Sequence, residues 1–403
     1  MAEATASTRR APANPVLRAA AVGVLALAAV ITVGLAWPNG EWSRSGAPLT
    51  VAGWAPYWQP EASLASFATN ADVFAGVSVV AYSATAATSV VRYPSLTDES
   101  VDTFKTAAGE AGVPLLATVF DDAPPGAMAA ILADPASRTA HVSTLFDIVR
   151  VGGFGGVDLD YETFAFEDAR STWATTRPNW ISFLGELKSR LETIDAELVV
   201  SVPPVYDGGT TDDSGYWVYD HAAMGSIVDR IRVMAYDYST TGGPPGPVAP
   251  IEWVQGLVDA LVELVPPDKL DLGIPVYGYD WVVGVVGACP VDQAPEHDVI
   301  STARIARLVT ERGWTPIWDT ATAEPSIDYV DTLSGVDSTG AAATCTVNRT
   351  IRYLDARAVH ARAYLAHRAD LHGITIWALG YDDEATWQAV RWARRGEASW
   401  PPA

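Results

Sequence analysis

Residues 154–162 read FGGVDLDYE, an apolar run that ends in acids at every second position. Alternate residues of a β-strand share a face, so Asp158, Asp160 and Glu162 project the same way, with neighbours about 6.5–7 Å apart. Carboxylates on the inner face of a sheet are costly unless they have a task. The stretch therefore predicts a strand whose last residues carry a functional acid row, with Glu162 nearest the C-terminal end.

Seven other short apolar runs alternate with amphipathic stretches along the chain. Runs apolar on both faces suit a parallel sheet covered on both sides. Eight strand–helix units predict a (β/α)8 TIM barrel over residues 50–395, in which active sites lie at the C-terminal ends of the strands. A doubly wound open sheet is the alternative. The other runs are LTVAGW (49–54), FAGVSVVAY (74–82), VPLLATVF (113–120), ELVVSVP (197–203), IRVMAYDY (231–238), LDLGIPVY (270–277) and GITIWALG (373–380).

Helices are predicted between the strands from apolar residues at i, i+3, i+4 and i+7. Asp134-Pro135 and Arg177-Pro178 are expected near helix starts, where proline is tolerated. The stripes are Val142, Leu145, Phe146 and Val149; Trp180, Leu184, Leu187 and Leu191; and Val254, Leu257, Val258, Leu261 and Val265.

The regular spacing of strands and helices is interrupted once, between the apolar runs at 270–277 and 373–380. The gap contains a helical stretch and three strand-like pieces, which predict a small α+β insertion at about 282–355. Both cysteines of the chain, Cys289 and Cys345, fall inside it. In an exported chain this pair could form one local disulfide.

The first forty residues predict export. Arg9, Arg10 and Arg18 precede an uncharged run at 19–37, which as a helix spans about 28 Å, close to the hydrocarbon thickness. Positive charge on this side predicts that residues 1–18 stay in the cytoplasm and the rest is outside. We expect a membrane anchor, with a cleaved signal peptide and a secreted protein as the alternative. Residues 38–49 form a linker and 396–403 a tail.

Composition and motifs give no sign of nucleic-acid binding, a metal site or a phosphate-binding loop. The formal charge is −22, from 26 Lys and Arg against 48 Asp and Glu, and no basic cluster follows the N-terminus, so we expect no nucleic-acid partner. The six histidines show no metal-ligand spacing, and no phosphate-binding glycine loop is present. We expect no metal and no cofactor, and a monomer. The 15 tryptophans exceed what a core needs and suit flat contacts with sugar rings.

Three adjacent carboxyl groups cannot all ionise cheaply, so at least one should hold a proton at neutral pH. A proton shared within the row can keep Glu162 available as a general acid. A divalent-cation site and a solvated strand end are the alternatives. The cation would need more oxygen ligands from a loop. The solvated end fits poorly because Val157, Leu159 and Tyr161 make the opposite face apolar.

The stretch resembles the fourth-strand signature of family 18 glycoside hydrolases, DxxDxDxE. Its last three acids match as Asp158, Asp160 and Glu162, whereas Gly155 stands where the first Asp is usual. The resemblance implies Glu162 as the acid, Asp160 as the residue that holds the substrate's acetamido N–H, and Asp158 as the residue that tunes Asp160 through the shared proton. The substrate's acetamido oxygen then attacks the anomeric carbon, with retention through an oxazolinium intermediate.

Two further elements support the resemblance. VMAYDYS is similar to the family's Met-x-Tyr-Asp element on strand six, with Met234, Tyr236 and Asp237 in place, and Trp377 occupies the position of the tryptophan beneath the central sugar. The resemblance implies that the Tyr236 hydroxyl orients the acetamido oxygen. It also implies that Met234, Asp237, Trp377 and Trp54 contact the substrate.

The implied substrate is a β-1,4-linked glycan that contains N-acetylglucosamine, as in peptidoglycan or chitin. Strand three, LLATVFDD, lacks the Ser-x-Gly-Gly element usual in chitinases, and the loop after strand six looks like the spore-cortex and cell-wall branch. These features favour peptidoglycan over chitin, and both stay open. A sugar-binding lectin without activity is the alternative function, although such proteins typically lack the terminal Glu. A membrane-tethered scaffold gives no reason for the acid row.

Overall fold

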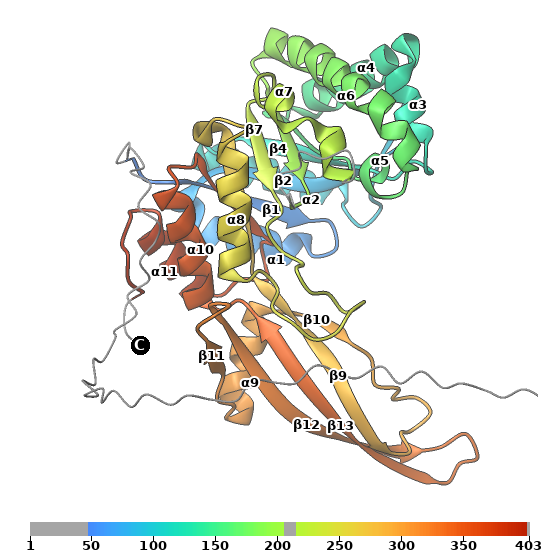
Figure 1. Cartoon of the computed structure of the whole chain (residues 1–403), viewed down its shortest axis with the longest axis vertical. Coiled ribbons are helices and arrows are strands. Elements are labelled where there is room, and N and C mark those ends of the chain that lie inside the picture. Colours follow the sequence, from blue (N-terminus) through green and yellow to red (C-terminus); the bar gives the residue numbers. More distant parts are fainter. Residues whose placement is uncertain (1–46, 205–214, 401–403) are drawn as a thin grey trace, which may run out of the picture. The chain divides into compact units, whose positions relative to one another are not determined.

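The computed structural model describes residues 47–204 and 215–400 (Figure 1). Eight parallel strands form a closed barrel, because β1 pairs with both β14 and β2. This confirms the predicted barrel over the open sheet. The barrel strands are β1 (Thr50–Pro56), β2 (Phe74–Ala86), β4 (Leu115–Asp121), β5 (Gly156–Asp160), β6 (Glu197–Val202), β7 (Arg230–Val233), β8 (Leu270–Pro275) and β14 (Gly373–Trp377), and β3 (Ser89–Arg92) extends β2 as a hairpin.

Helices cover the outside of the barrel, and the predicted apolar stripes are their buried faces. All four residues of the first stripe are buried on α4, and those of the second on α6. Val265 is buried too, but it lies beyond the end of α8. The helices are α1 (Pro60–Thr69), α2 (Asp98–Ala111), α3 (Ala127–Ala133), α4 (Pro135–Gly152), α5 (Thr163–Phe166), α6 (Arg170–Leu191), α7 (His221–Gly225), α8 (Ile251–Val262), α10 (Ala356–Arg368) and α11 (Glu384–Ala393).

The two proline signals have different outcomes. Asp134 caps α4 through a hydrogen bond from the Ser137 amide, and Pro135 occupies the first turn as predicted. The prediction for Pro178 was wrong, because α6 begins at Arg170 and the proline lies inside the helix. The turn before Pro178 is held by tertiary contacts: Trp173 Nε1 donates to the Phe164 carbonyl, and Thr176 is buried. Packing thus offsets the amide that proline lacks.

The insertion is an antiparallel sheet of five strands with one helix, and it lies between β8 and α10 (Figure 1). Its sheet begins at Tyr277, five residues before the predicted boundary of 282, because β9 follows β8 almost directly. Its elements are β9 (Tyr277–Gly287), β10 (Asp298–Ser301), α9 (Thr302–Arg312), β11 (Ile317–Asp319), β12 (Glu324–Val336) and β13 (Ala342–Tyr353).

Buried charges tie the insertion to the barrel. Arg362 on α10 is 1% exposed and lies 3.1 Å from Glu324, the first residue of β12. The same carboxylate accepts hydrogen bonds from the Val248 and Ala249 amides before α8. Because both charges are paired and hydrogen-bonded, their burial is tolerated, and they fix the base of the insertion.

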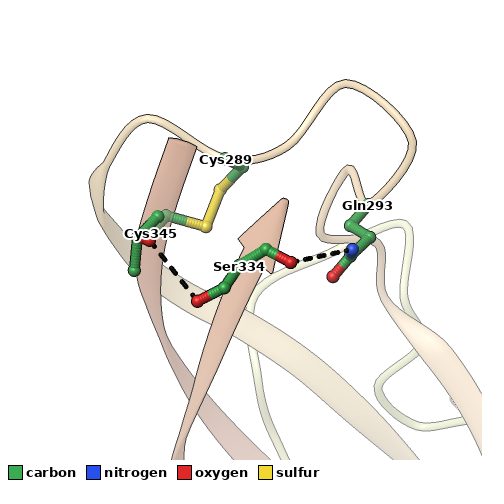
Figure 2. Close-up of a disulfide and its surroundings, with 5 residues drawn as sticks. Cys289, Gln293, Ser334 and Cys345 are labelled. Carbon is green, nitrogen blue, oxygen red and sulfur yellow. Dashed lines mark hydrogen bonds between the residues drawn. A yellow bond between two sulfur atoms is a disulfide. The ribbon is translucent and has the colours of Figure 1, made fainter. Parts of the chain in front are cut away.

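A disulfide between Cys289 and Cys345 closes the far end of the insertion, across a sequence separation of 56 residues (Figure 2). Replacing both cysteines by serine should lower the unfolding free energy of the insertion by about 2–4 kcal/mol, because the bond restricts the unfolded chain. Thermal unfolding followed by circular dichroism measures this. Gln293→Ala, which removes only a neighbouring hydrogen bond to the Ser334 carbonyl, is the control. An unchanged melting temperature in the serine variant would contradict the expectation.

The predicted segment 19–37 lies outside the described residues. The helices within residues 47–204 and 215–400 include none with the length and apolar character of a transmembrane segment.

Candidate active site

The acid row lies where β5 ends and α5 begins. Asp158 is fully buried within β5, whereas Asp160, the last residue of the strand, and Glu162, two residues later, are half-buried. Gly156 lets β5 approach β6, because a Cβ there would lie 2.4 Å from the Glu197 carbonyl oxygen. The glycine therefore serves strand packing, and the acids follow at the mouth of the barrel.

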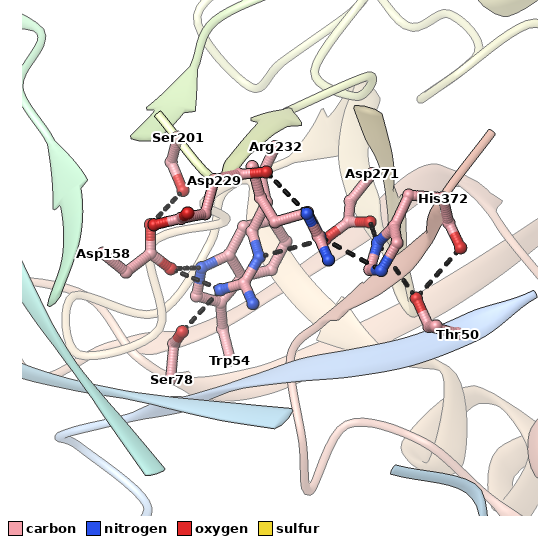
Figure 3. Close-up of polar contacts among 10 residues, drawn as sticks. Thr50, Trp54, Ser78, Asp158, Ser201, Asp229, Arg232, Asp271 and His372 are labelled. Carbon is pink, nitrogen blue, oxygen red and sulfur yellow. Dashed lines mark hydrogen bonds and ion pairs between the residues drawn. The ribbon is translucent and has the colours of Figure 1, made fainter. Parts of the chain in front are cut away.

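Asp158 is held by three donors from three other strands (Figure 3). Its Oδ2 accepts from Trp54 Nε1 at 3.0 Å and from an Arg232 guanidinium nitrogen at 2.6 Å. Its Oδ1 accepts from the Ser201 hydroxyl at 2.8 Å. Asp158 is therefore the deep, fixed member of the row.

Asp160 and Glu162 share a hydrogen bond between their carboxyl groups. Burial, together with the charges of Glu162 and Asp158, raises the pKa of Asp160 well above its ordinary value. Burial raises the pKa of Glu162 to about 7, although the hydrogen bond from Asp160 works in the opposite direction. The pair thus holds one proton at neutral pH, and Asp160 is its donor in this arrangement.

One acceptor of this pair is unused. Asp160 Oδ1 is buried and has no hydrogen-bond partner among the described residues. A buried acceptor without a partner carries a free-energy penalty, which a ligand N–H can remove. The pair can therefore accept a hydrogen bond at Asp160 and give up a proton at Glu162.

The residues after β7 form the second wall of the site. Tyr236 is buried, and its close approach needs Gly273 on β8, where a Cβ would lie 3.2 Å from the Tyr236 ring. Burial, then the charges of Asp160, Asp237 and Glu162, raise the pKa of the Tyr236 phenol well above its ordinary value, so it remains a donor. Met234 precedes it and is half-buried.

Asp237 is exposed at this wall, with a left-handed backbone at φ 61°. One of its oxygens accepts hydrogen bonds from the hydroxyls of Tyr277 and Tyr279, the latter at 2.6 Å. Both tyrosines lie on β9, so the first strand of the insertion reaches the site. The sequence motif included Asp237 but gave no sign of these partners.

Three tryptophans lie close together at β1 and β14: Trp54 on β1, Trp58 just after it, and Trp377 at the end of β14. Trp377, at the end of β14, is half-buried, and its ring makes edge contacts with Trp54 and Trp58, each at 5.9 Å between centroids. Trp54 is only 2% exposed, so its buried ring does not fit the predicted contact with a sugar. Its Nε1 donates a hydrogen bond to Asp158. Trp58 is 44% exposed, so of these tryptophans it is the one with an accessible ring face.

Sequence reasoning missed two further charged residues. Asp121 ends β4, and burial raises its pKa to about 7. Arg232 on β7 contacts Asp158. Arg232 lies in the run 231–238, which was interpreted as apolar, and its only signal was a charge within a strand covered on both sides. Asp121 directly follows the run 113–120, so its position at the end of a strand was the only signal. No cluster that could hold a metal ion occurs in the described part of the chain.

Comparisons with known proteins identify the family and the fold. Residues 121–382 match the family model "Glycosyl hydrolases family 18". A putative sporulation-specific glycosylase of Bacillus subtilis, YdhD, is 34% identical over 155 residues, which are 38% of this chain and 34% of that protein. The cortical fragment-lytic enzyme of Bacillus anthracis is 24% identical over 263 residues, 64% of this chain and 54% of the enzyme. The chain thus spans about a third to a half of these relatives.

Among solved structures, a chitinase from Chromobacterium violaceum superposes with a TM-score of 0.69 at 24% sequence identity. The match covers 87% of this chain and 100% of the chitinase chain. At this identity the likeness shows the shared barrel fold.

Proposed function

Because the chain belongs to family 18 of the glycosyl hydrolases, we propose that it cleaves β-1,4-linked glycans next to an N-acetylglucosamine unit, with retention at the anomeric carbon. The observation that carries this proposal is the Asp160–Glu162 pair, which holds one proton and leaves Asp160 Oδ1 as a buried, unused acceptor. The acetamido N–H of the sugar is a donor that suits this acceptor.

In the proposed reaction the acetamido N–H binds Asp160, and the proton of the pair moves to Glu162. Glu162 protonates the glycosidic oxygen as the bond to the anomeric carbon breaks, and the acetamido oxygen forms a new bond to that carbon. The Asp160 carboxylate then stabilises the positive oxazolinium, and the Tyr236 hydroxyl orients the acetamido oxygen. Water, deprotonated by Glu162, opens the ring and restores the acid.

The pKa of Glu162 gives an expected pH profile. The acid form of a carboxyl group is present below its pKa and lost above it, so kcat/KM should fall above about pH 7, by about tenfold per pH unit. Initial rates on a soluble N-acetylglucosamine oligomer between about pH 5 and 9 measure this. A profile that stays flat through that range would contradict the assignment of Glu162 as the acid.

We propose peptidoglycan glycan strands as the substrate in preference to chitin. The names of the sporulation-specific glycosylase and the cortical fragment-lytic enzyme support this, as does the absence of the Ser-x-Gly-Gly element from strand three. Purified peptidoglycan and chitin oligosaccharides should be digested side by side, with products identified by mass. Release from chitin alone would overturn the preference. Release from neither would overturn the proposed hydrolase activity on both substrates.

We also propose that segment 19–37 anchors the barrel outside the cell membrane. The arginines before it and its uncharged length support this. Cells expressing the full chain should retain the protein in the membrane fraction after high-salt washing, whereas a chain starting at residue 38 should not. Release of the full chain into the medium would instead favour a cleaved signal peptide.

A further inference from the structure

Arg232 places a positive charge inside the barrel, and it lies outside the motifs quoted above (Figure 3). It is the third residue of β7, and its side chain is 4% exposed. Bulky aliphatic side chains ordinarily fill the interior of such a barrel. A guanidinium there is costly unless opposite charges lie beside it, so its partners indicate its role.

The guanidinium lies between two carboxylates. One terminal nitrogen donates to Asp158 Oδ2 at 2.6 Å and to the Ser78 hydroxyl at 2.5 Å. Nε lies 3.5 Å from Asp271 Oδ2, which is an ion-pair contact without a hydrogen bond. Because these partners come from β5, β2 and β8, Arg232 spans the barrel interior directly beneath the acid row.

The donors around Asp158 define its charge. Oδ2 faces Trp54 Nε1 and Arg232, and both are donors that cannot accept a proton from Asp158. Oδ1 accepts from the Ser201 hydroxyl. A proton on Oδ2 would break two hydrogen bonds, and a proton on Oδ1 would require the Ser201 hydroxyl to turn from donor to acceptor, so this geometry suits the ionised form.

The far side of Arg232 is also fixed. Asp271 Oδ1 accepts from His372 Nδ1 at 2.6 Å, and Arg230 Nε donates to His372 Nε2 at 3.0 Å, so the proton of the ring lies on Nδ1. Burial acts to raise the pKa of Asp271, but the His372 hydrogen bond and the Arg232 and Arg230 charges outweigh it and hold that pKa below its ordinary value. Asp271 therefore stays an anion and holds the guanidinium in place.

We infer that Arg232 keeps Asp158 ionised and thereby confines the mobile proton of the acid row to Asp160 and Glu162. Arg232 is thus a positioning residue that acts through Asp158, and its effect on turnover rests on the function proposed above. This inference differs from the proton shared between Asp158 and Asp160 that the resemblance implied.

The charge of Asp158 has a consequence for the pair above it. The charged and titratable groups around Asp158 are Asp160 and Glu162 at the end of β5, Arg232 and Arg230 on β7, Tyr236 and Asp237 after it, and Asp271 and His372 on the β8 and β14 side. Among them, Asp158 is an anion that raises the pKa of Asp160. A neutral residue at 158 should let the pair release its proton at lower pH.

The test compares Asp158→Asn, Arg232→Met and the double variant. The alkaline limb is the fall of kcat/KM at high pH. Asp158→Asn removes one anion about 6.5 Å from Asp160 and should move this limb down by about 1–2 pH units. In Arg232→Met the buried Asp158 should take up a proton, so an anion and a more distant cation are both lost and the downward shift should be smaller. The double variant should then match Arg232→Met, because residue 158 is neutral in both. A double variant that differs from Arg232→Met, or an upward shift in a folded Arg232→Met protein, would overturn the inference.

Two further variants separate this role from a structural one. Arg232→Lys retains a cation and should restore most of the wild-type limb. Ser78→Ala removes the other partner of the same guanidinium nitrogen but leaves Asp158 paired, and it should leave the limb in place. A shift in Ser78→Ala equal to that of Arg232→Met would show that barrel packing, and not the Asp158 charge, sets the limb.

A second measurement needs no substrate and no Arg232→Met protein. With the aspartate carboxyl carbons labelled with 13C, the Asp158 resonance is the one lost in Asp158→Asn. In the wild-type chain it should keep the chemical shift of a carboxylate from about pH 8 to 5, the range that includes the pKa of Glu162 at about 7. An Asp158 resonance that titrates together with Asp160 would overturn the inference, whether or not the protein cleaves glycans.

Discussion

Replacing Glu162 by glutamine is expected to lower kcat by about 10³-fold, because glutamine keeps the size of the side chain but has no acidic proton to give to the glycosidic oxygen. Binding should remain, since the tryptophans and Tyr236 are unchanged. Turnover of an N-acetylglucosamine tetramer gives kcat, and isothermal titration calorimetry gives Kd, which we expect within about twofold of the wild-type value.

Glu167→Gln is the matched control for this variant. Glu167 directly follows α5, five residues after Glu162, and is exposed, so the same chemical change there should leave kcat unaltered. If the Glu162 variant cleaves as fast as the wild type, the acid is another residue. If the wild type binds the tetramer without cleaving it, the sugar-binding lectin becomes the better description.

Asp160→Asn should lower kcat by about 10²–10³-fold with little change in KM. Asparagine fits the space and can still accept the acetamido N–H through its carbonyl oxygen, so the bound substrate loses little. It has no negative charge for the oxazolinium, so the loss falls on the transition state. Steady-state kinetics on the same tetramer separate the two effects.

The control for Asp160→Asn is the same substitution at Asp147, an exposed residue of α4 paired only with Arg150 among the described contacts. It should show wild-type kinetics. An Asp160→Asn protein whose KM rises while kcat is unchanged would assign Asp160 to ground-state binding and contradict its role in charge stabilisation.

Most of the fold could be predicted because its signals are local. All eight apolar runs became barrel strands, since side chains covered on both faces of a parallel sheet must be apolar almost throughout. Pro178 shows the limit of local signals. The start of α6 depends on contacts of Trp173 and Thr176 with the rest of the molecule, and a proline rule applied to the chain alone could not include them.

Only part of the site could be predicted, because some of its contacts are not local in the sequence. The acid row could be read from its alternation, because strand geometry alone places its members on one face. The partners of the row could not, since Trp54, Ser201 and Arg232 come from three other strands and meet only when the barrel closes. Likewise Tyr279 reaches Asp237 from a strand of the insertion, 42 positions along the chain.

The polar layer around Arg232 determines how this active site could be transferred to another protein. An engineer who copied only residues 158–162 into a barrel with an aliphatic interior would bury Asp158 without its cation. Either the scaffold would lose stability, or the acids would titrate in the wrong order. The smallest unit that can be grafted therefore also includes Trp54, Ser78, Ser201, Arg232 and Asp271, so a second family of barrels could acquire this chemistry only by changing residues on six strands together.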